Sequence, residues 1–434
     1  MKKSLLILMA AAAIVACSKN DTVKELENET VLIGFETYHA NSTRAAVTAP
    51  SGLTSANGGF GVYGFKHANN VEASNHVINL SSTSSNASDA VKIFDNVKVW
   101  YESSSTQTQG FTYEVPKYWD VQKYYTFFAY APYTNVASGS TTGISFDQAT
   151  GKFTRNDIIA LQSANATTPG TVSVSVGYES AQSRTQYGTA DESGIIDYLI
   201  ATYVPGQKKG ATNQQNSSAT YDPTTGKDVT VGFTFYHILS KLNILVQAKD
   251  ETGASGHGYS GVKSIKVTSL NITNLPAASD VATYAQTGPE TSEGTFTSAA
   301  YASTLTLIGT GGLSTSELYI LDGGNMANST ITNPASYIPQ NFHYYVAPNT
   351  PATAHILNID YTITYVDGII EPYTRSIDLS QAANLQSGSA TFSTMAQNNV
   401  YNLTVTIGLN QIYFTVDEVE EWADPENDTN VPVE

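Results

Sequence analysis

The sequence predicts an all-β fold, and three features carry that prediction. Short runs of alternating apolar and polar residues recur along the chain and are rich in Val, Ile, Thr, Tyr and Phe. Stretches rich in Ser, Gly, Asn and Thr separate them, and no long run after residue 31 has the period of a helix. Because 434 residues are enough for two domains, we expect two β-sandwiches in tandem.

The composition is typical of an exported protein rich in β-strands. Only 14% of the residues are charged, so Ser, Thr, Asn, Gly and the 27 Tyr must supply most of the polar surface. The formal net charge of −17 opposes binding to nucleic acid, because the phosphates would be repelled. We therefore expect no nucleic-acid partner.

Residues 1–17 are predicted to be a lipoprotein signal peptide. Lys2 and Lys3 precede an apolar run over residues 5–15, which is too short to span a membrane and has the length of a signal-peptide core. The run ends in Ile14-Val15-Ala16-Cys17, which resembles the lipobox of bacterial lipoproteins. Cys17, the single cysteine, is predicted to be lipidated, with an ordinary secretory signal as the alternative.

Residues 18–44 are predicted to hold a polar tether followed by the first strand. Residues 18–30 are polar and charged and show no regular period. Val31, Ile33 and Phe35 then alternate with other residues, as in a strand with one apolar face. Order is expected to begin near Val31.

Further strands are expected in the order of the chain. Each expected run alternates apolar with polar residues or is continuously apolar, and turn-forming residues bound it. The expected strands cover residues 59–65, 91–101, 111–115, 124–130, 195–203, 229–247, 262–272, 356–366 and 400–416.

Two of these runs change phase. Apolar residues fall on odd numbers up to Phe235 but on even numbers from Ile238, and the same change separates residues 401–409 from Ile412, Phe414 and Val416. A strand changes phase only at a bulge, a bend or a corner between two sheets. We place the domain division near residue 248, which gives domains over residues 45–248 and 249–434.

No catalytic or metal-binding pattern stands out, so neither an enzyme activity nor a cofactor is predicted. The chain lacks HExxH, GxSxG, P-loop and GxGxxG motifs, and its acidic tail over residues 417–428 lacks the spacing of a calcium loop. His237 and His343 are interpreted as core or corner residues. The aromatic residues Trp100, Tyr101, Trp119, Tyr124 and Tyr125 are interpreted as core, with a sugar-stacking platform as the alternative.

Several segments together resemble one known family. They are the lipobox, residues 31–37, Ser42-Thr43-Arg44-Ala45, residues 118–119, 125–132, 235–242, 338–340 and 401–407, and the region near Trp422. Their order along the chain resembles that of the fimbrillins, the subunits of type V pili of anaerobic Gram-negative bacteria.

The resemblance implies two transthyretin-like β-sandwich domains and assembly by donor-strand exchange. It implies an outer-membrane lipoprotein precursor that an arginine-specific protease cuts between Arg44 and Ala45. The removable strand with Val31, Ile33 and Phe35 would then leave, and a strand of another pilus subunit would fill its groove. Ile412, Phe414 and Val416 repeat the three-residue pattern and are the candidate donor strand.

Other functions remain open from the sequence. Within the family, the chain is a shaft, tip or anchor subunit, and the Arg44 site favours the shaft. From a different class, a surface lipoprotein that binds glycans shares the lipobox, the β-sandwiches and the aromatic residues. That alternative predicts an N-terminus that stays intact in the mature protein.

Overall fold

The fold is almost entirely β, as the sequence predicts. Its only helical element in the described part of the chain is a 3-10 turn, η1, at Pro50–Leu53. The computed structural model describes residues 32–39, 50–67, 90–102, 110–120, 123–135, 143–163, 165–166, 170–174, 182–186, 190–191, 195–207, 230–248, 262–297, 301–309, 318–322, 336–337, 340–348, 354–365, 367–381, 395–407 and 412–421.

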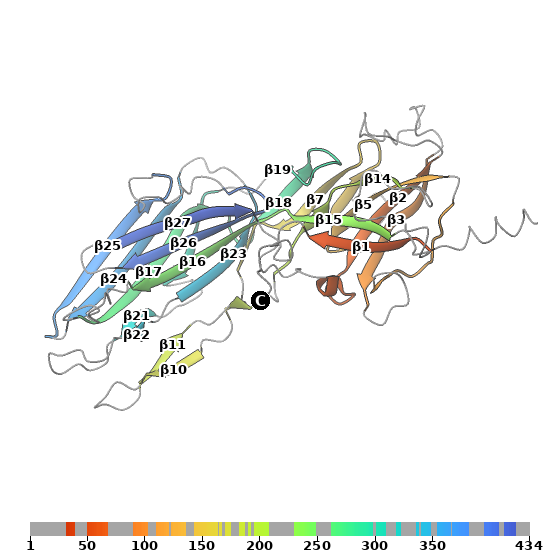
Figure 1. Ribbon diagram of the computed structural model, residues 1–434. Helices are drawn as coiled ribbons and strands as arrows, with labels where there is room; N and C mark the ends of the chain where they lie inside the picture. Colours follow the sequence, from red (N-terminus) through yellow and green to blue (C-terminus); the bar gives the residue numbers. More distant parts are fainter. Residues whose placement is uncertain are drawn as a thin grey trace, which may run out of the picture.

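An eight-stranded sheet dominates the N-terminal half (Figure 1). Its two outer strands, β1 and β4, lie in contact, so the sheet curls around an aromatic core. In spatial order the sheet contains β1 (Gly34–His39), β15 (Thr230–His237), β13 (Leu199–Ala201), β5 (Tyr124–Ala131), β2 (Phe60–His67), β3 (Val91–Tyr101) and β4 (Phe111–Thr112), and β14 (Val204–Gln207) also pairs with β5.

A four-stranded sheet covers the other face of this curled sheet. Its order is β19 (Gly294–Thr297), β18 (Val281–Gln286), β7 (Lys152–Ile159) and β6 (Ile144–Asp147). Phe65 and Phe128 from the large sheet share one buried cluster with Phe153 and Tyr284 from the small sheet. The large sheet is therefore buried on both faces, which explains why β5 reads as a continuous apolar run instead of alternating.

Two further sheets enclose the second large core. One has the order β27 (Ile412–Glu421), β26 (Asn399–Ile407), β16 (Ser240–Ala248), β23 (Gln340–Val346) and β8 (Leu161–Ser163). The other has the order β22 (Ser336–Tyr337), β21 (Leu318–Asp322), β17 (Val262–Leu275), β24 (Ile356–Tyr365) and β25 (Ile370–Asp378), with β20 (Ser303–Ile308) also on β17. Alternate residues of β16, β24 and β26 fill this core together with apolar residues of β17, as in a sandwich.

The first phase change is a passage between sheets. β15 belongs to the large N-terminal sheet and ends at His237, whereas β16 begins at Ser240 in the five-stranded sheet. Ile238 and Leu239 between them are fully buried. Of the three explanations that the sequence left open, a bulge, a bend or a corner, the structure shows the corner between two sheets.

The second phase change is a hairpin and not a corner. β26 and β27 pair antiparallel within one sheet, with Ile407 opposite Ile412 and Leu403 opposite Val416. The expectation of one long strand over residues 400–416 is therefore wrong. The parity of the apolar residues changes because the chain turns back on itself, and Gly408 and Asn410 at the break lie outside the described residues.

Strands from both sides of residue 248 combine in two of the sheets. β18 pairs with β7, and β23 pairs with the short strand β8. In Figure 1, β18 and β19 lie where the two groups of sheets meet. The division of the chain at residue 248 remains a prediction.

Candidate functional site

The first described strand, β1, lies at an edge of the large sheet. It pairs in parallel with β15, from Gly34 opposite Thr230 to His39 opposite Phe235. β1 and its parallel partner β15 lie far apart in the sequence, so β1 can pair only after the chain around residue 230 has folded. Because β1 lies at the edge, it pairs with only one strand, β15, in the described part of the sheet (Figure 1).

Phe35 inserts its side chain into a cage of aromatic rings. Only 1% of Phe35 is exposed, and its ring is stacked on Phe233 with centroids 5.9 Å apart and an interplanar angle of 18°. Edge-to-face contacts surround the rest of the ring, a geometry that favours aromatic pairs. These contacts join Phe35 to Phe94 at 5.4 Å, Tyr113 at 5.7 Å, Phe127 at 5.9 Å and Phe60 at 6.3 Å.

Ile33 is held through both of its backbone polar groups. Its N–H donates to the carbonyl oxygen of Lys117 at 2.9 Å, and its own carbonyl oxygen accepts from the Tyr113 hydroxyl at 2.7 Å. Leu32 forms an isolated antiparallel bridge with Tyr118. The Ile33 side chain is fully buried in the same core as Phe35.

Burial raises the pKa of Tyr113 to about 12, against a weaker opposing effect of the Lys117 backbone hydrogen bond. The hydroxyl therefore remains protonated at neutral pH and acts as the donor to the Ile33 carbonyl. This contact could not be predicted, because nothing in the spacing of residues 111–118 relates them to residue 33.

The groove described by these contacts can hold one strand. Main-chain pairing with β15 supplies affinity for any strand, and the pockets for Ile33 and Phe35 supply specificity for alternate side chains. Of the predicted removable strand, the structure brings Ile33 and Phe35 together in the core, whereas Val31 lies outside the described residues. Cys17, Arg44 and Ala45 also lie outside them.

The candidate donor strand also lies at a sheet edge. β27 pairs with β26 and has no second partner strand among the residues that the structure describes. The backbones of Ile412, Phe414 and Val416 face those of Ile407, Val405 and Leu403. This segment is therefore the outer strand of a hairpin, in a position from which a strand can be exchanged.

Comparison with known proteins identifies the family. Residues 43–422 match a family model described as fimbrillin-like. The chain belongs to the fimbrillin-like family. It is also 25% identical over 450 residues to the fimbrium subunit Fim1C of Phocaeicola vulgatus, with 100% of this chain and 99% of that protein covered.

The crystal structure of a fimbrial protein from Bacteroides vulgatus aligns with 91% of this fimbrillin-like chain and 100% of its own chain, at 16% identity and a TM-score of 0.49. A likeness at this TM-score adds no weight, so the assignment rests on the sequence match. Arg44 and Ala45 fall within the matched residues, and Cys17 precedes them.

The aromatic residues proposed for a platform divide into two sets. Trp119 and Tyr125 are buried and pack edge to face with centroids 4.8 Å apart, as the core interpretation predicts. Trp100, Tyr101 and Tyr124 are half-buried. Lys98 Nζ lies 6.0 Å from the centre of the Trp100 ring, so a cation contacts this half-buried indole.

The structure places both singled-out histidines in polar pairs. His237 Nδ1 lies 2.8 Å from Asp197 Oδ1, and only 1% of each side chain is exposed. His343 Nδ1 lies 2.7 Å from the amide oxygen of Asn243. The interpretation of His237 as a core or corner residue is confirmed, because its side chain is buried and it is the last residue of β15. Within the described ranges, no group of three potential metal ligands is present, and no helix is long and apolar enough to cross a membrane.

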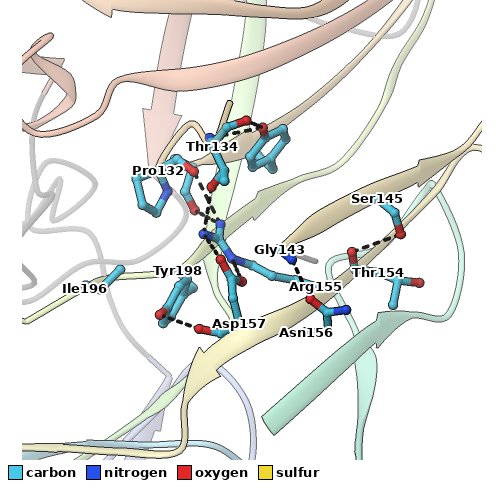
Figure 2. Close-up of polar contacts among 12 residues, drawn as sticks. Pro132, Thr134, Gly143, Ser145, Thr154, Arg155, Asn156, Asp157, Ile196 and Tyr198 are labelled. Atoms are coloured by element: carbon cyan, nitrogen blue, oxygen red, sulfur yellow. Dashed lines mark hydrogen bonds and ion pairs between the residues drawn. The ribbon is translucent and has the colours of Figure 1, made fainter. Parts of the chain in front are cut away.

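A buried arginine joins the large sheet to the four-stranded sheet, and sequence reasoning missed it. Arg155 on β7 is 3% exposed, and its Nε donates to Asp157 Oδ1 at 2.7 Å (Figure 2). Its Nη1 donates to the Pro132 carbonyl at 3.3 Å, and its guanidinium carbon lies 4.5 Å from the centre of the Tyr198 ring. The guanidinium thus connects the end of β5 with β7 and with the segment before β13.

We expect Arg155→Met to lower the free energy of unfolding by about 2–3 kcal/mol, because several hydrogen bonds of one charged donor are lost together. The Asp157 side chain is 35% exposed, so water can solvate the carboxylate and limit the loss. Urea denaturation measures the effect, and Lys152→Met on the same strand is the matched control. Equal losses in the two variants would contradict a structural role for the Arg155 contacts.

Proposed function

We propose that this fimbrillin-like chain is a structural subunit of a surface pilus that polymerises by donor-strand exchange and supports adhesion. The observation that carries the proposal is the burial of Phe35, 1% exposed, on a strand at the edge of its sheet. A strand that completes a core but lies at an edge is replaceable by any strand with the same side-chain pattern. The role is structural and requires no cofactor.

The N-terminal sequence supports processing before assembly. In the proposal, the precursor is lipidated on Cys17, is held at the outer membrane, and is cut by an arginine-specific protease between Arg44 and Ala45. Arg44 is the first arginine of the chain, and no Lys or Arg follows it before Lys66. A cut there separates β1 covalently from the rest of the fold, since β1 ends at His39.

The other pilus subunits are the proposed partners. β27 supplies the candidate donor segment, in which Ile412, Phe414 and Val416 alternate as Val31, Ile33 and Phe35 do. A shaft position follows from combining a removable strand with a donor strand in one chain. The acidic net charge of −17 favours solubility of the polymer.

Replacing Arg44 with alanine tests the proposal. We expect the variant to remain a lipidated monomer of full length, whereas the wild type yields filaments whose subunits begin at Ala45. The measurement is the N-terminal sequence and mass of surface protein, after centrifugation has separated filaments from membranes. Lys66→Ala, which removes one positive charge beyond the cut, is the control and should still form filaments.

Filaments built from Arg44→Ala chains with intact N-termini would exclude strand exchange triggered at Arg44. A wild-type protein that begins at acylated Cys17 and occurs only in membranes would exclude the shaft role. Saturable binding to a polysaccharide would then separate a glycan-binding lipoprotein from a pilus anchor.

A further inference from the structure

The residues just before β1 are held by a segment that lies outside β15, the strand with which β1 pairs. We call residues 113–118 the clasp. Tyr113 donates its hydroxyl hydrogen to the Ile33 carbonyl at 2.7 Å, Lys117 accepts the Ile33 N–H at 2.9 Å, and Tyr118 bridges to Leu32. The Tyr113 ring also contacts Phe35 and Phe94, with centroids 5.7 Å and 5.5 Å away.

We propose that the clasp keeps β1 in its groove after the chain is cut, so that cleavage and strand release are separate steps. The cut subunit then stays attached, through β1, to the peptide that carries the lipid until another strand displaces β1. This inference rests on the proposed function, because that function supplies the cut and the lipid.

Cleavage alone removes none of the contacts that the structure describes between β1 and the rest of the fold. The proposed cut at residue 44 lies five positions beyond His39, outside the strand. The pairing from Gly34 to His39 with β15, the buried Phe35 side chain and the clasp contacts are all non-covalent. A strand with a fully buried aromatic anchor leaves slowly, because the anchor must be exposed to water before it can leave.

The position of the clasp also gives release a direction. After the cut, the chain continues for only five residues beyond the His39 end of β1, whereas the Ile33 end is held by the clasp. An incoming strand that pairs with β15 therefore displaces β1 from His39 towards Ile33, and the clasp opens last. The Tyr113 hydroxyl is buried, and its only partners among the described residues are Ile33 and Lys117. Replacing Tyr113 with phenylalanine removes the hydrogen bond from this hydroxyl to Ile33 but leaves the aromatic ring in the core.

The test measures how long the cut peptide stays bound. The full chain is prepared in detergent with a site for a sequence-specific protease in place of residues 40–44, so that cutting does not depend on a cellular enzyme. After cutting, an excess of a synthetic peptide of residues 31–39 is added. Size-exclusion chromatography and mass spectrometry then follow the N-terminal peptide that remains with the body of the protein.

We expect the wild-type body to retain its peptide after cutting and to lose it slowly to the competitor. Tyr113→Phe keeps the ring but removes the hydroxyl bond, and its peptide should exchange about five- to tenfold faster. Tyr284→Phe is the matched control, because it removes a buried hydroxyl bond to the Ser292 carbonyl (2.5 Å) that is remote from β1. Its exchange rate should equal that of the wild type.

Immediate loss of the peptide from the cut wild type would overturn the proposal, as would an unchanged exchange rate in Tyr113→Phe. Neither result bears on whether the native filament begins at Ala45, which the Arg44 experiment decides. A failure of the clasp is therefore distinguishable from a failure of the proposed pilus function.

Discussion

Replacing Phe35 with alanine will lower the free energy of unfolding by about 3–5 kcal/mol, the range found when a fully buried aromatic side chain is truncated. The loss is expected to be large because the cage around Phe35 cannot collapse easily. Its rings come from five separate segments of the chain, and those of Phe94 and Phe127 also contact each other. Most of the volume left by the phenyl ring will therefore remain empty.

Urea denaturation of the uncut protein measures this loss. Glu36→Ala is the matched control, because Glu36 is half-buried on the same strand and successive residues of a strand point to opposite faces. We expect the control to change the free energy of unfolding by less than about 1 kcal/mol. Phe35→Leu should fall between the two, since leucine fills part of the cavity. A Phe35→Ala loss as small as that of the control would mean that β1 does not complete the core.

Several strands could be predicted from sequence because their residues alternate towards a single core. The expected strand over residues 91–101 matches β3, and the expected strand over residues 356–366 differs from β24 by one residue. β24 alternates half-buried and buried residues over most of its length, which is the pattern that sequence analysis detects best. The apolar residues change from odd to even numbers around His237, and this change marks the place where the chain passes from one sheet to the next.

The expected strand over residues 195–203 shows where periodicity misleads. Only Leu199–Ala201 forms β13 in this run. The Gln162 side chain takes the place of a strand at Ile196, because its amide nitrogen donates to the Ile196 carbonyl at 3.0 Å and its oxygen accepts the Ile196 N–H at 2.8 Å. A side chain 34 positions away satisfies this backbone, and no local pattern reveals such a contact.

The parts of the groove that involve distant residues were also beyond sequence reasoning. Alternation predicted that Ile33 and Phe35 share an apolar face, and the structure confirms this. It did not predict the parallel pairing with β15 or the Tyr113 hydrogen bond, because both join segments about 80 to 200 positions apart. β7 was missed because its buried Arg155 interrupts the apolar pattern. The guanidinium is tolerated there because it donates hydrogen bonds to Asp157 and to the Ala131 carbonyl.

Replacing Asp197 with alanine is the second change for which we expect a loss of about 3–5 kcal/mol, because it removes one partner of a buried polar pair. The carboxylate lies 2.8 Å from His237 Nδ1, and water reaches about 1% of either side chain. The alanine variant leaves the imidazole N–H without this acceptor in a site that water does not solvate. Asp197→Asn keeps an acceptor oxygen and should therefore lose much less.

A double-mutant cycle with His237→Ala isolates the interaction between the two residues. We expect a coupling energy above about 1 kcal/mol, because the groups are in direct contact and share one buried site. Asp120→Ala is the surface control, since its 3.5 Å ion pair with Lys66 is 30–38% exposed and should contribute at most about 1 kcal/mol. Additive losses in the cycle would show that the pair does not act as a unit.

This pair also connects the groove to the second half of the protein. His237 is the last residue of β15, the strand on which β1 lies, and β16 of the five-stranded sheet begins three residues later. Loss of the pair should therefore increase hydrogen exchange at the backbone amides of residues 235–241 as well as lower the free energy of unfolding. If exchange rises only around Asp197, the pair stabilises its own segment, and the passage between the sheets is fixed by the buried Ile238 and Leu239 side chains instead.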